Sequence, residues 1–494
     1  MGWEWLKRLI FPAAAIAPFS FDVGDPAPAT VIRPRQWQQQ LIQLLRRRLD
    51  GEAKANDDLL VFAGPGAGKT LGALLAFQAM QREQQLQRFL VFCHRTSILE
   101  QWQKAAARLD LTLMPWPGCG EDAALADGLL LTYQSAGRQP QMLREALQAW
   151  PAQGVLAIAD EAHHLGVDPD DPSAAAWGQT FLEVTAPMRL RLGLTGTPFR
   201  ADNLGFCAAR RIQTIHNGER VEQIQPDLCV EPRELIAAGD VRPLEFRFQD
   251  GWVEHSQEGR PDRDVSPLSQ EQRESWRARN LRRAIRLADG SGIGKQVLIQ
   301  AQKRLRRLRE SHPEAAGLVI ARDIDHASAI ASALREEGHR VDLVHSQDPE
   351  AGERLNNFQT GDADWLVSID MCAEGFDAPR LRVVAYLTTV VTRSRFLQGI
   401  TRAVRMTPEL AASEPVPRHP SYVFAPADPL LMEYARSWSV AEPYVLRSRE
   451  GLSEATPASG ATPRGPSLPL EAVDDGAAAV IRLKTPQLPS FLQR

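Results

Sequence analysis

The sequence of 494 residues contains little cysteine and no long apolar run. Its cysteines do not have the Cys-x-x-Cys spacing of metal or redox motifs, and they are only five in number: Cys93, Cys119, Cys207, Cys229 and Cys372. This pattern argues against a disulfide framework and a zinc site and favours a reducing compartment, so we expect a cytoplasmic protein. No stretch approaches the roughly 18 apolar residues of a membrane-spanning helix, so we expect no membrane partner.

A strong net charge is also missing. The 57 Lys and Arg residues against 61 Asp and Glu residues give a formal net charge of -4, so any nucleic-acid site must be a local basic surface. The sequence shows no internal repeat and no nuclease pattern of the PD-ExK or HNH type. A chain of this length is too long for one hydrophobic core, and we expect two or three domains.

The sequence does contain a phosphate-binding pattern, LLVFAGPGAGKT, at Leu59–Thr70. An apolar strand, a glycine-rich turn and a helix in this order direct backbone N–H groups and a helix N-terminus at one anion. We expect Lys69 to reach the β- and γ-phosphates of ATP and Thr70 to bind Mg²⁺. The alternative is a chance glycine-rich turn. The residues predicted to surround the nucleotide are Gly64, Pro65, Gly66, Ala67, Gly68, Lys69 and Thr70.

Two adjacent carboxylates, Asp160 and Glu161, follow a second apolar run at Val155–Ala159. Two charges at the end of a buried strand are costly unless a metal or hydrogen bonds satisfy them. We expect Asp160 to hold Mg²⁺ and Glu161 to orient and deprotonate the attacking water. The alternative is a strand that continues into an acidic loop.

Further apolar runs at Phe89–Phe92, Leu129–Leu131 and Leu190–Leu194 alternate with helical patterns. This alternation predicts a parallel, doubly wound sheet, in which ligands bind at the carboxyl ends of the strands. The polar segments His94–Thr96 and Thr132–Ser135 follow two of these runs and are placed to contact a partner. The alternative is that they are ordinary polar loops.

Together these motifs resemble those of the superfamily 2 helicases and translocases, in particular the restriction-type and repair-type branch that acts on double-stranded DNA. The sequence DEAH at Asp160–His163 and the sequence TGTP at Thr195–Pro198 stand in the order and spacing of that family. The resemblance implies that His163, Thr195 and Thr197 couple the carboxylate loop to the rest of the protein.

The resemblance extends to the segment before the phosphate-binding loop. Arg33-Pro34-Arg35-Gln36 is similar to the family's adenine-recognising element, which implies that Gln36 binds the base. An amide side chain can pair with adenine through two hydrogen bonds. The alternative is a solvent-facing glutamine at a helix start.

A second RecA-like domain must follow if the resemblance holds. The segment 370–379 resembles the family's fifth motif and implies coupling roles for Gly375 and Asp377. The segment 396–405 resembles the sixth, Q-x-x-G-R-x-x-R, with Thr401 in place of the glycine. It implies that Gln398 lies near the nucleotide. A planar guanidinium suits a phosphate. Arg402 and Arg405 would therefore stabilise charge on the γ-phosphate, unless they are solvated arginines of an amphipathic helix.

The predicted fold class is α/β, with two tandem RecA-like doubly wound parallel-sheet domains and ATP in the interdomain cleft. The predicted limits are an N-terminal arm at 1–28, an ATP-binding domain at 29–235, a C-terminal helicase domain at 236–440 and a disordered tail at 441–494. A basic segment, Arg277–Arg309, either follows nucleic-acid phosphates or is a solvated helical face.

The predicted function is an ATP-dependent nucleic-acid helicase or translocase that acts on DNA. In this mechanism, hydrolysis changes the angle between the domains and thereby moves a strand that both domains grip. The protein is also a candidate motor of a restriction-like or phage-defence system with a separate nuclease. The alternatives are an RNA helicase or remodeller, and a slowly hydrolysing ATP-dependent binding switch.

Overall fold

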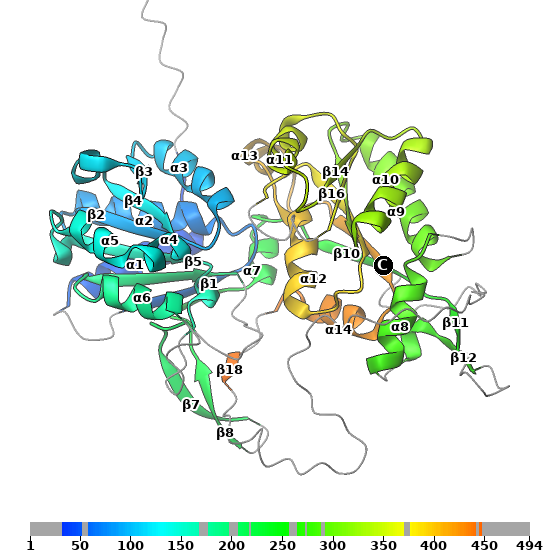
Figure 1. Ribbon diagram of the computed structural model, residues 1–494, viewed down its shortest axis with the longest axis horizontal. Helices are drawn as coiled ribbons and strands as arrows, with labels where there is room; N and C mark the ends of the chain where they lie inside the picture. Colours follow the sequence, from blue (N-terminus) through cyan, green and yellow to red (C-terminus); the bar gives the residue numbers. More distant parts are fainter. Residues whose placement is uncertain are drawn as a thin grey trace, which may run out of the picture.

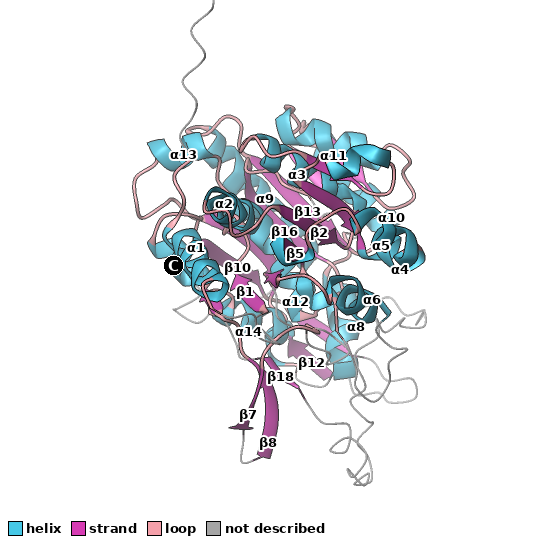
Figure 2. Cartoon of the chain, turned by 90° about the vertical axis from the view of Figure 1, so that its left-hand side faces the viewer, coloured by secondary structure: helices cyan, strands magenta, loops and turns pink. Residues whose placement is uncertain are grey.

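The computed structural model describes residues 32–51, 58–166, 176–196, 206–216, 219–255, 264–271, 274–287, 292–369, 376–440 and 444–446. These residues form two α/β units that lie side by side in Figure 1, the first in blue to cyan and the second in green to orange. In Figure 2 the strands lie between helices. The predicted fold class of two tandem RecA-like domains is confirmed.

The first unit is built on seven parallel strands in the order β3-β4-β2-β5-β6-β1-β9. Strand β5 is buried along its whole length, as expected for a strand covered on both faces. It lies between β2 and β6, so its final residue, Asp160, reaches the carboxyl edge beside the ends of both. The strands are β1 Leu59–Ala63, β2 Arg88–Cys93, β3 Leu113–Pro115, β4 Gly128–Thr132, β5 Val155–Asp160, β6 Leu190–Thr195 and β9 Leu228–Val230.

Helix α1 packs on α2, the helix that follows the phosphate-binding loop. Gly72 on α2 permits this approach, because a Cβ there would lie 2.7 Å from Trp37 Cη2 on α1. No described helix is long and apolar enough to cross a membrane. The helices of the first unit are α1 Gln36–Leu49, α2 Lys69–Arg82, α3 Leu99–Ala107, α4 Tyr133–Arg138, α5 Pro140–Leu147, α6 Ala176–Thr185 and α7 Pro232–Ala237.

The second unit is built on six parallel strands in the order β10-β17-β16-β13-β15-β14. The strands are β10 Leu244–Gln249, β13 Ala316–Ala321, β14 Val341–Val344, β15 Trp365–Ser368, β16 Leu381–Leu387 and β17 Ser421–Pro426. The helices are α8 Glu274–Ala284, α9 Ile293–Arg309, α10 Ile324–Glu336, α11 Ala351–Thr360, α12 Arg393–Ile400, α13 Pro408–Ser413 and α14 Pro429–Ser437.

Two small antiparallel sheets extend the units. Strands β11 (Trp252–His255) and β12 (Asp264–Pro267) pair with each other in the second unit. Strands β7 (Arg211–His216) and β8 (Glu219–Ile224) form a hairpin that projects from the first unit in Figure 1. Strand β18 (Tyr444–Leu446) pairs with β8, so three residues of the predicted disordered tail are ordered. The predicted arm and the rest of that tail lie outside the described residues.

Candidate active site

The phosphate-binding loop connects β1 to α2. Gly66 and Gly68 have φ values of +78° and +79°, in the left-handed region that glycine adopts without a steric penalty. The Ala67 N–H donates to Gly64 O at 3.1 Å, which closes the turn. Helix α2 begins at Lys69, so its N-terminus adjoins the loop. The loop therefore has the shape that lets backbone N–H groups and a helix end face one anion.

Lys69 meets the second carboxylate of the predicted pair. Its Nζ lies 3.5 Å from Glu161 Oε1, while His163 Nδ1 lies 3.4 Å from Glu161 Oε2. The Gly196 N–H also donates to Oε2, at 3.4 Å. Glu161 itself has φ +50°, a conformation that is uncommon for a non-glycine residue and often found at functional sites. The structure therefore brings the two predicted motifs together.

Asp160 is 5% exposed and receives three hydrogen bonds. Trp102 Nε1–H donates to its Oδ2 at 2.8 Å, and the Glu161 N–H donates to its Oδ1 at 3.1 Å. The Tyr133 hydroxyl donates to its backbone carbonyl at 2.6 Å. Sequence reasoning did not identify Trp102 and Tyr133 as partners of Asp160. The available signal was that each follows an apolar run, and the carboxyl ends of parallel strands meet at one edge of a sheet.

The two carboxylates have opposite electrostatic environments. Burial raises the pKa of Asp160, and the charge of Glu161 adds to this effect. Burial also acts to raise the pKa of Glu161, but the nearby Lys69 and His163 outweigh it, so the pKa of Glu161 lies below its usual value. Titratable pairs whose environments separate their pKa values are typical of acid–base sites.

The carboxylate loop contacts the end of β6 and the segment after β2. His163 Nδ1 lies 3.1 Å from Thr195 Oγ1, which places the predicted coupling residues in contact. The neighbouring His164 ring stacks on His94 with a centroid distance of 4.3 Å. Thr197 lies outside the described residues.

The sixth-motif segment of the second unit lies against the phosphate-binding loop. A Cβ at Gly66 would lie 3.7 Å from Arg405 Cγ, so the stem of Arg405 is next to the loop. Its guanidinium Nη1 lies 2.9 Å from Asp377 Oδ1, and the buried Arg402 guanidinium donates to the backbone carbonyl of Phe376. Both arginines are thus held by the fifth-motif segment. Gln398 is half-buried on α12, and Gly375 lies outside the described residues.

The structure places Gln38, and not Gln36, against the phosphate-binding loop. Gln36 begins α1 with an exposed side chain. Gln38 is 1% exposed and donates from Nε2 to Gly68 O at 3.1 Å, and Trp37 Nε1–H donates to Ala67 O at 3.0 Å. Helical spacing from Leu41 could have shown that Gln38 shares the buried face of α1, since residues three apart lie on one side of a helix.

Arg35 links the loop to the start of the second unit. Its Nη1 donates to Gly66 O at 2.7 Å, and its Nε lies 3.3 Å from Asp240 Oδ1. Burial lowers the pKa of Arg35, although the Asp240 carboxylate acts in the opposite direction. This contact ties the phosphate-binding loop to the chain that enters β10.

The side chains at the carboxyl edge are suited to Mg²⁺ and ATP. Thr70 and Asp160 offer the oxygen donors that Mg²⁺ prefers, and Lys69 offers a point charge for phosphate. Gly66 and Gly68 supply the left-handed backbone with which a loop turns its N–H groups toward one anion. The residues present therefore fit a nucleotide with a divalent cation.

The basic segment has a substantial structural role. Arg277 forms a buried ion pair with Asp428 at 3.0 Å, and the Arg304 guanidinium lies 3.8 Å from the centre of the Tyr422 ring. Arg309 pairs with Asp364. These three cations have partners within the second unit, which argues against a role in following nucleic-acid phosphates at these positions, and Arg277 is buried where the alternative was a solvated face.

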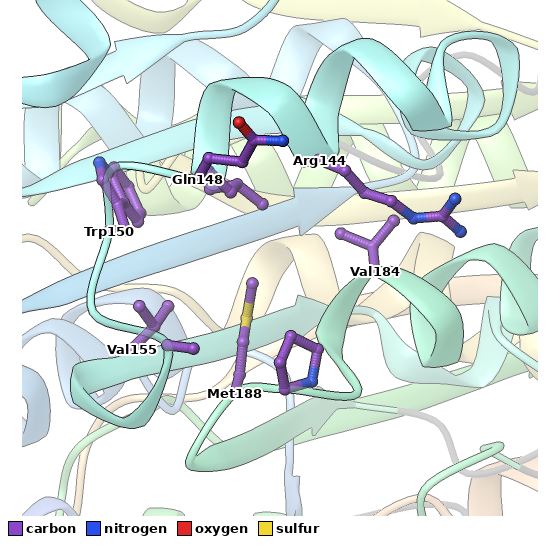
Figure 3. Close-up of a pocket in the computed structure, with 9 residues that line it drawn as sticks. Arg144, Gln148, Trp150, Val155, Val184 and Met188 are labelled. Atoms are coloured by element: carbon purple, nitrogen blue, oxygen red, sulfur yellow. The ribbon is translucent and has the colours of Figure 1, made fainter.

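An apolar cavity of about 250 Å³ lies at the other end of β5. Figure 3 shows Trp150, Val155, Val184 and Met188 around it. Val155 begins β5 and Asp160 ends it, so this cavity is separate from the carboxylates. It has no part in the site described above.

Comparisons with known proteins agree with these observations. Residues 31–200 match the model of the family "Type III restriction enzyme, res subunit", and residues 300–407 match "Helicase conserved C-terminal domain". The chain belongs to the superfamily 2 helicases, in their restriction-type branch. The resemblance inferred from the motifs is confirmed, and one match falls on each of the two sheets, in the expected order.

Two relatives align with a larger part of the chain than either family model does. "Uncharacterized protein Rv2917" of Mycobacterium tuberculosis is 31% identical over 435 residues, which are 86% of this chain and 66% of that protein. "Putative helicase 22" of Sulfolobus islandicus filamentous virus is 23% identical, over 70% of this chain and 58% of that protein. The chain thus spans 66% and 58% of the lengths of these two relatives.

One solved structure shows the same fold. It is "the fragment structure of a putative HsdR subunit of a type I restriction enzyme from Vibrio vulnificus YJ016", with a TM-score of 0.52 and 18% identity. The alignment covers 83% of this chain and 67% of that chain. This likeness supports the arrangement of two RecA-like domains in one chain.

Proposed function

We propose that the protein is an ATP-dependent helicase or translocase that acts on DNA. The observation that carries this proposal is the meeting of three motifs at one place: Lys69 beside Glu161, and Arg405 beside Gly66. They come from the phosphate-binding loop, the carboxylate loop and the second unit. A site that needs both units is suited to converting hydrolysis into relative movement of the units.

The residues have distinct roles in this proposal. Thr70 and Asp160 hold Mg²⁺, which neutralises charge on the phosphates when it is bound. Lys69 binds the phosphates, and Glu161, kept ionised by its lowered pKa, orients the attacking water and accepts its proton. Arg405 and Arg402 stabilise charge on the γ-phosphate.

The coupling residues connect this site to the rest of the chain. The His163–Thr195 contact would report the state of the carboxylate loop to β6. Asp377 and the adjoining fifth-motif segment restrain the arginines until the units close around ATP. Closing and opening would then move a nucleic-acid strand that contacts both units. The units of this mechanism are the predicted domains at 29–235 and 236–440.

DNA is favoured over RNA because the matched family and the structural neighbour are restriction enzymes by name. Restriction also requires strand cleavage, and no nuclease pattern is present in this sequence. We therefore infer a separate nuclease or defence-system subunit as a partner. Co-purification from native cells tests this partner: recovery of a nuclease supports it, and recovery of the motor without any nuclease counts against it.

ATP hydrolysis by purified protein tests the function. It should be measured without nucleic acid and with single-stranded DNA, duplex DNA and single-stranded RNA of matched sequence, at low salt. We expect strong stimulation by DNA that is lost in Lys69→Ala. Greater stimulation by RNA would indicate the RNA remodeller instead. A Lys69-dependent rate that no nucleic acid changes would contradict the motor and indicate a partner-gated switch.

A further inference from the structure

Asp160 accepts hydrogen bonds from two segments, one after β2 and one after β4. In the sheet, β2 lies between β4 and β5, with Cys93 paired to Thr132 and Phe92 paired to Ala159. The carboxyl ends of these three strands are therefore level. The segments after β2 and β4 emerge beside the carboxylate loop, at the edge where parallel sheets bind ligands.

The first hydrogen bond comes from the segment after β2. Trp102 lies on α3, is fully buried and donates its indole N–H to Asp160 Oδ2 at 2.8 Å. The same segment touches the carboxylate loop a second time through the His94–His164 stack. Between these contacts, Arg95 and Thr96 are exposed. The segment thus has exposed polar residues, Arg95 and Thr96, and buried contacts with the carboxylate loop.

The second hydrogen bond comes from the segment after β4. Tyr133 begins α4, is 2% exposed, and donates its hydroxyl to the Asp160 carbonyl at 2.6 Å. A reciprocal cap between Thr132 and Ser135 fixes the start of this helix. The next residue, Gln134, is exposed.

We propose that Trp102 and Tyr133 are positioning residues that orient Asp160 for Mg²⁺ and transmit to it the binding of a nucleic-acid backbone at Arg95, Thr96 and Gln134. Partners of a metal-binding carboxylate set its orientation and thereby its affinity for the metal. Both residues are buried and contact Asp160, so each would act through that carboxylate. The transmission part of this inference rests on the proposed function, whereas the positioning part does not.

The structure offers matched control residues for both positions. Trp150 Nε1–H donates to Ala123 O at 3.2 Å beside the apolar cavity of Figure 3. Tyr386 is 1% exposed on β16 and donates its hydroxyl to Val390 O at 2.6 Å, the same length as the Tyr133 bond. Trp150→Phe and Tyr386→Phe therefore remove equivalent donors whose hydrogen bonds go to other residues than Asp160.

The first experiment measures Mn²⁺ affinity by electron paramagnetic resonance, with a non-hydrolysable ATP analogue and no nucleic acid. We expect Trp102→Phe to weaken Mn²⁺ binding about tenfold, as loss of a ligand's hydrogen-bond partner does. Tyr133→Phe should weaken it about threefold, because one hydrogen bond to the backbone is lost. The control variants should match the wild type. Wild-type affinity in both test variants would overturn the proposal.

Protein folding is checked in the same samples by thermal unfolding. Trp102→Phe leaves a smaller ring in a fully buried position, so its folding must be verified. If Trp102→Phe does not fold, Tyr133→Phe decides the outcome, because it removes a single oxygen atom. A Tyr133→Phe protein that folds and keeps wild-type Mn²⁺ affinity would then overturn the proposal.

The second experiment measures DNA stimulation of hydrolysis at saturating Mg²⁺. We expect a smaller ratio of stimulated to basal rate in the two test variants than in the two controls. Weaker Mn²⁺ binding with an unchanged ratio would overturn the transmission part. A wild-type protein without stimulation would contradict the proposed function, while the Mn²⁺ affinities would still decide the positioning roles of Trp102 and Tyr133.

Discussion

The two halves of the proposed ATP site are held in different ways. In the first unit, Asp160 is fixed by donors from two neighbouring strand ends and from its own loop. In the second unit, Arg405 is paired with Asp377, and Arg402 is bound to a carbonyl of the same fifth-motif segment. The metal-binding half is therefore preorganised, whereas the arginines are occupied by partners in their own unit.

This difference indicates which half must rearrange during hydrolysis. A carboxylate and a phosphate compete for one guanidinium, because both accept its planar pair of donors. In the proposed mechanism, Arg405 would therefore exchange Asp377 for the γ-phosphate when the units close. Asp160 needs no comparable exchange. We expect the second unit to supply the switch and the first unit to supply the fixed chemistry.

Removing the proposed base should have the largest effect. Glu161→Gln should slow ATP hydrolysis by about 10²- to 10⁴-fold, since a positioned base contributes that much to proton transfer. Nucleotide binding should remain, because Lys69 is intact. Single-turnover hydrolysis and binding of a fluorescent ATP analogue measure the two quantities. Glu100→Gln, at an exposed position of the same unit, is the control. A Glu161→Gln rate close to the wild type would contradict the assignment.

Substitutions of Arg405 and of Asp377 should have different effects on the rate of ATP hydrolysis. Arg405→Ala should lower the hydrolysis rate at least about 100-fold, because one aimed donor to developing charge is lost. Asp377→Asn should keep or raise the rate, because it frees Arg405 from its present partner. Both rates are measured at saturating ATP and DNA. Equal slowing by both substitutions would show that Asp377 is needed for catalysis and would contradict the exchange.

A buried ion pair in the second unit should contribute to the stability of the fold. Arg242 and Glu414 form an ion pair at 2.6 Å with exposures of only 1% and 6%, and the Arg242 N–H donates to Val404 O. Glu414→Ala should lower the free energy of unfolding by about 3–5 kcal/mol, because it leaves a buried charge without its partner. Urea unfolding measures this change. Glu100→Ala is the control, because Glu100 forms an exposed pair with Lys104, and it should leave the urea midpoint of unfolding unchanged. A Glu414→Ala protein with the midpoint of the wild type would contradict a stabilising role of the buried pair.

Substitutions of Gln36 and Gln38 on α1 should give the smallest effects. Gln38→Ala should weaken ATP binding about two- to tenfold, because it removes one hydrogen bond that shapes the loop at Gly68. Gln36→Ala should alter the preference of ATP over GTP if Gln36 binds adenine. Competition binding with both nucleotides measures each effect. Loss of base preference in Gln38→Ala alone would transfer the adenine role to Gln38.

The sequence was sufficient for the parts of the structure that follow local rules. Apolar runs that end in Gly-Lys-Thr or Asp-Glu predicted strands with functional residues at their carboxyl ends, and the structure has β1 and β5 there. The partners of these residues were not predictable in the same way. Trp102 and Tyr133 contact Asp160 only because β2 stands next to β5 and β4 stands next to β2, and strand order is a tertiary property.

Dependence on tertiary packing also explains why the sequence singled out Gln36 whereas Gln38 contacts the loop. The resemblance singled out Gln36 by its place in a motif, whereas contact with the loop depends on which face of α1 packs on α2. It also explains the basic segment, since the partners of Arg277 and Arg309 lie more than 50 residues away in the sequence, at Asp428 and Asp364. Charge composition alone cannot distinguish paired cations from free ones.

The central claim is that ATP closes the units and brings Arg405 onto the nucleotide. The most direct test is a distance measurement by pulsed electron resonance between spin labels at exposed positions, Leu125 in the first unit and Glu337 in the second. The account predicts a shorter distance with a non-hydrolysable ATP analogue and DNA, and no shortening in Lys69→Ala. An unchanged distance in a protein that hydrolyses ATP in response to DNA would contradict it.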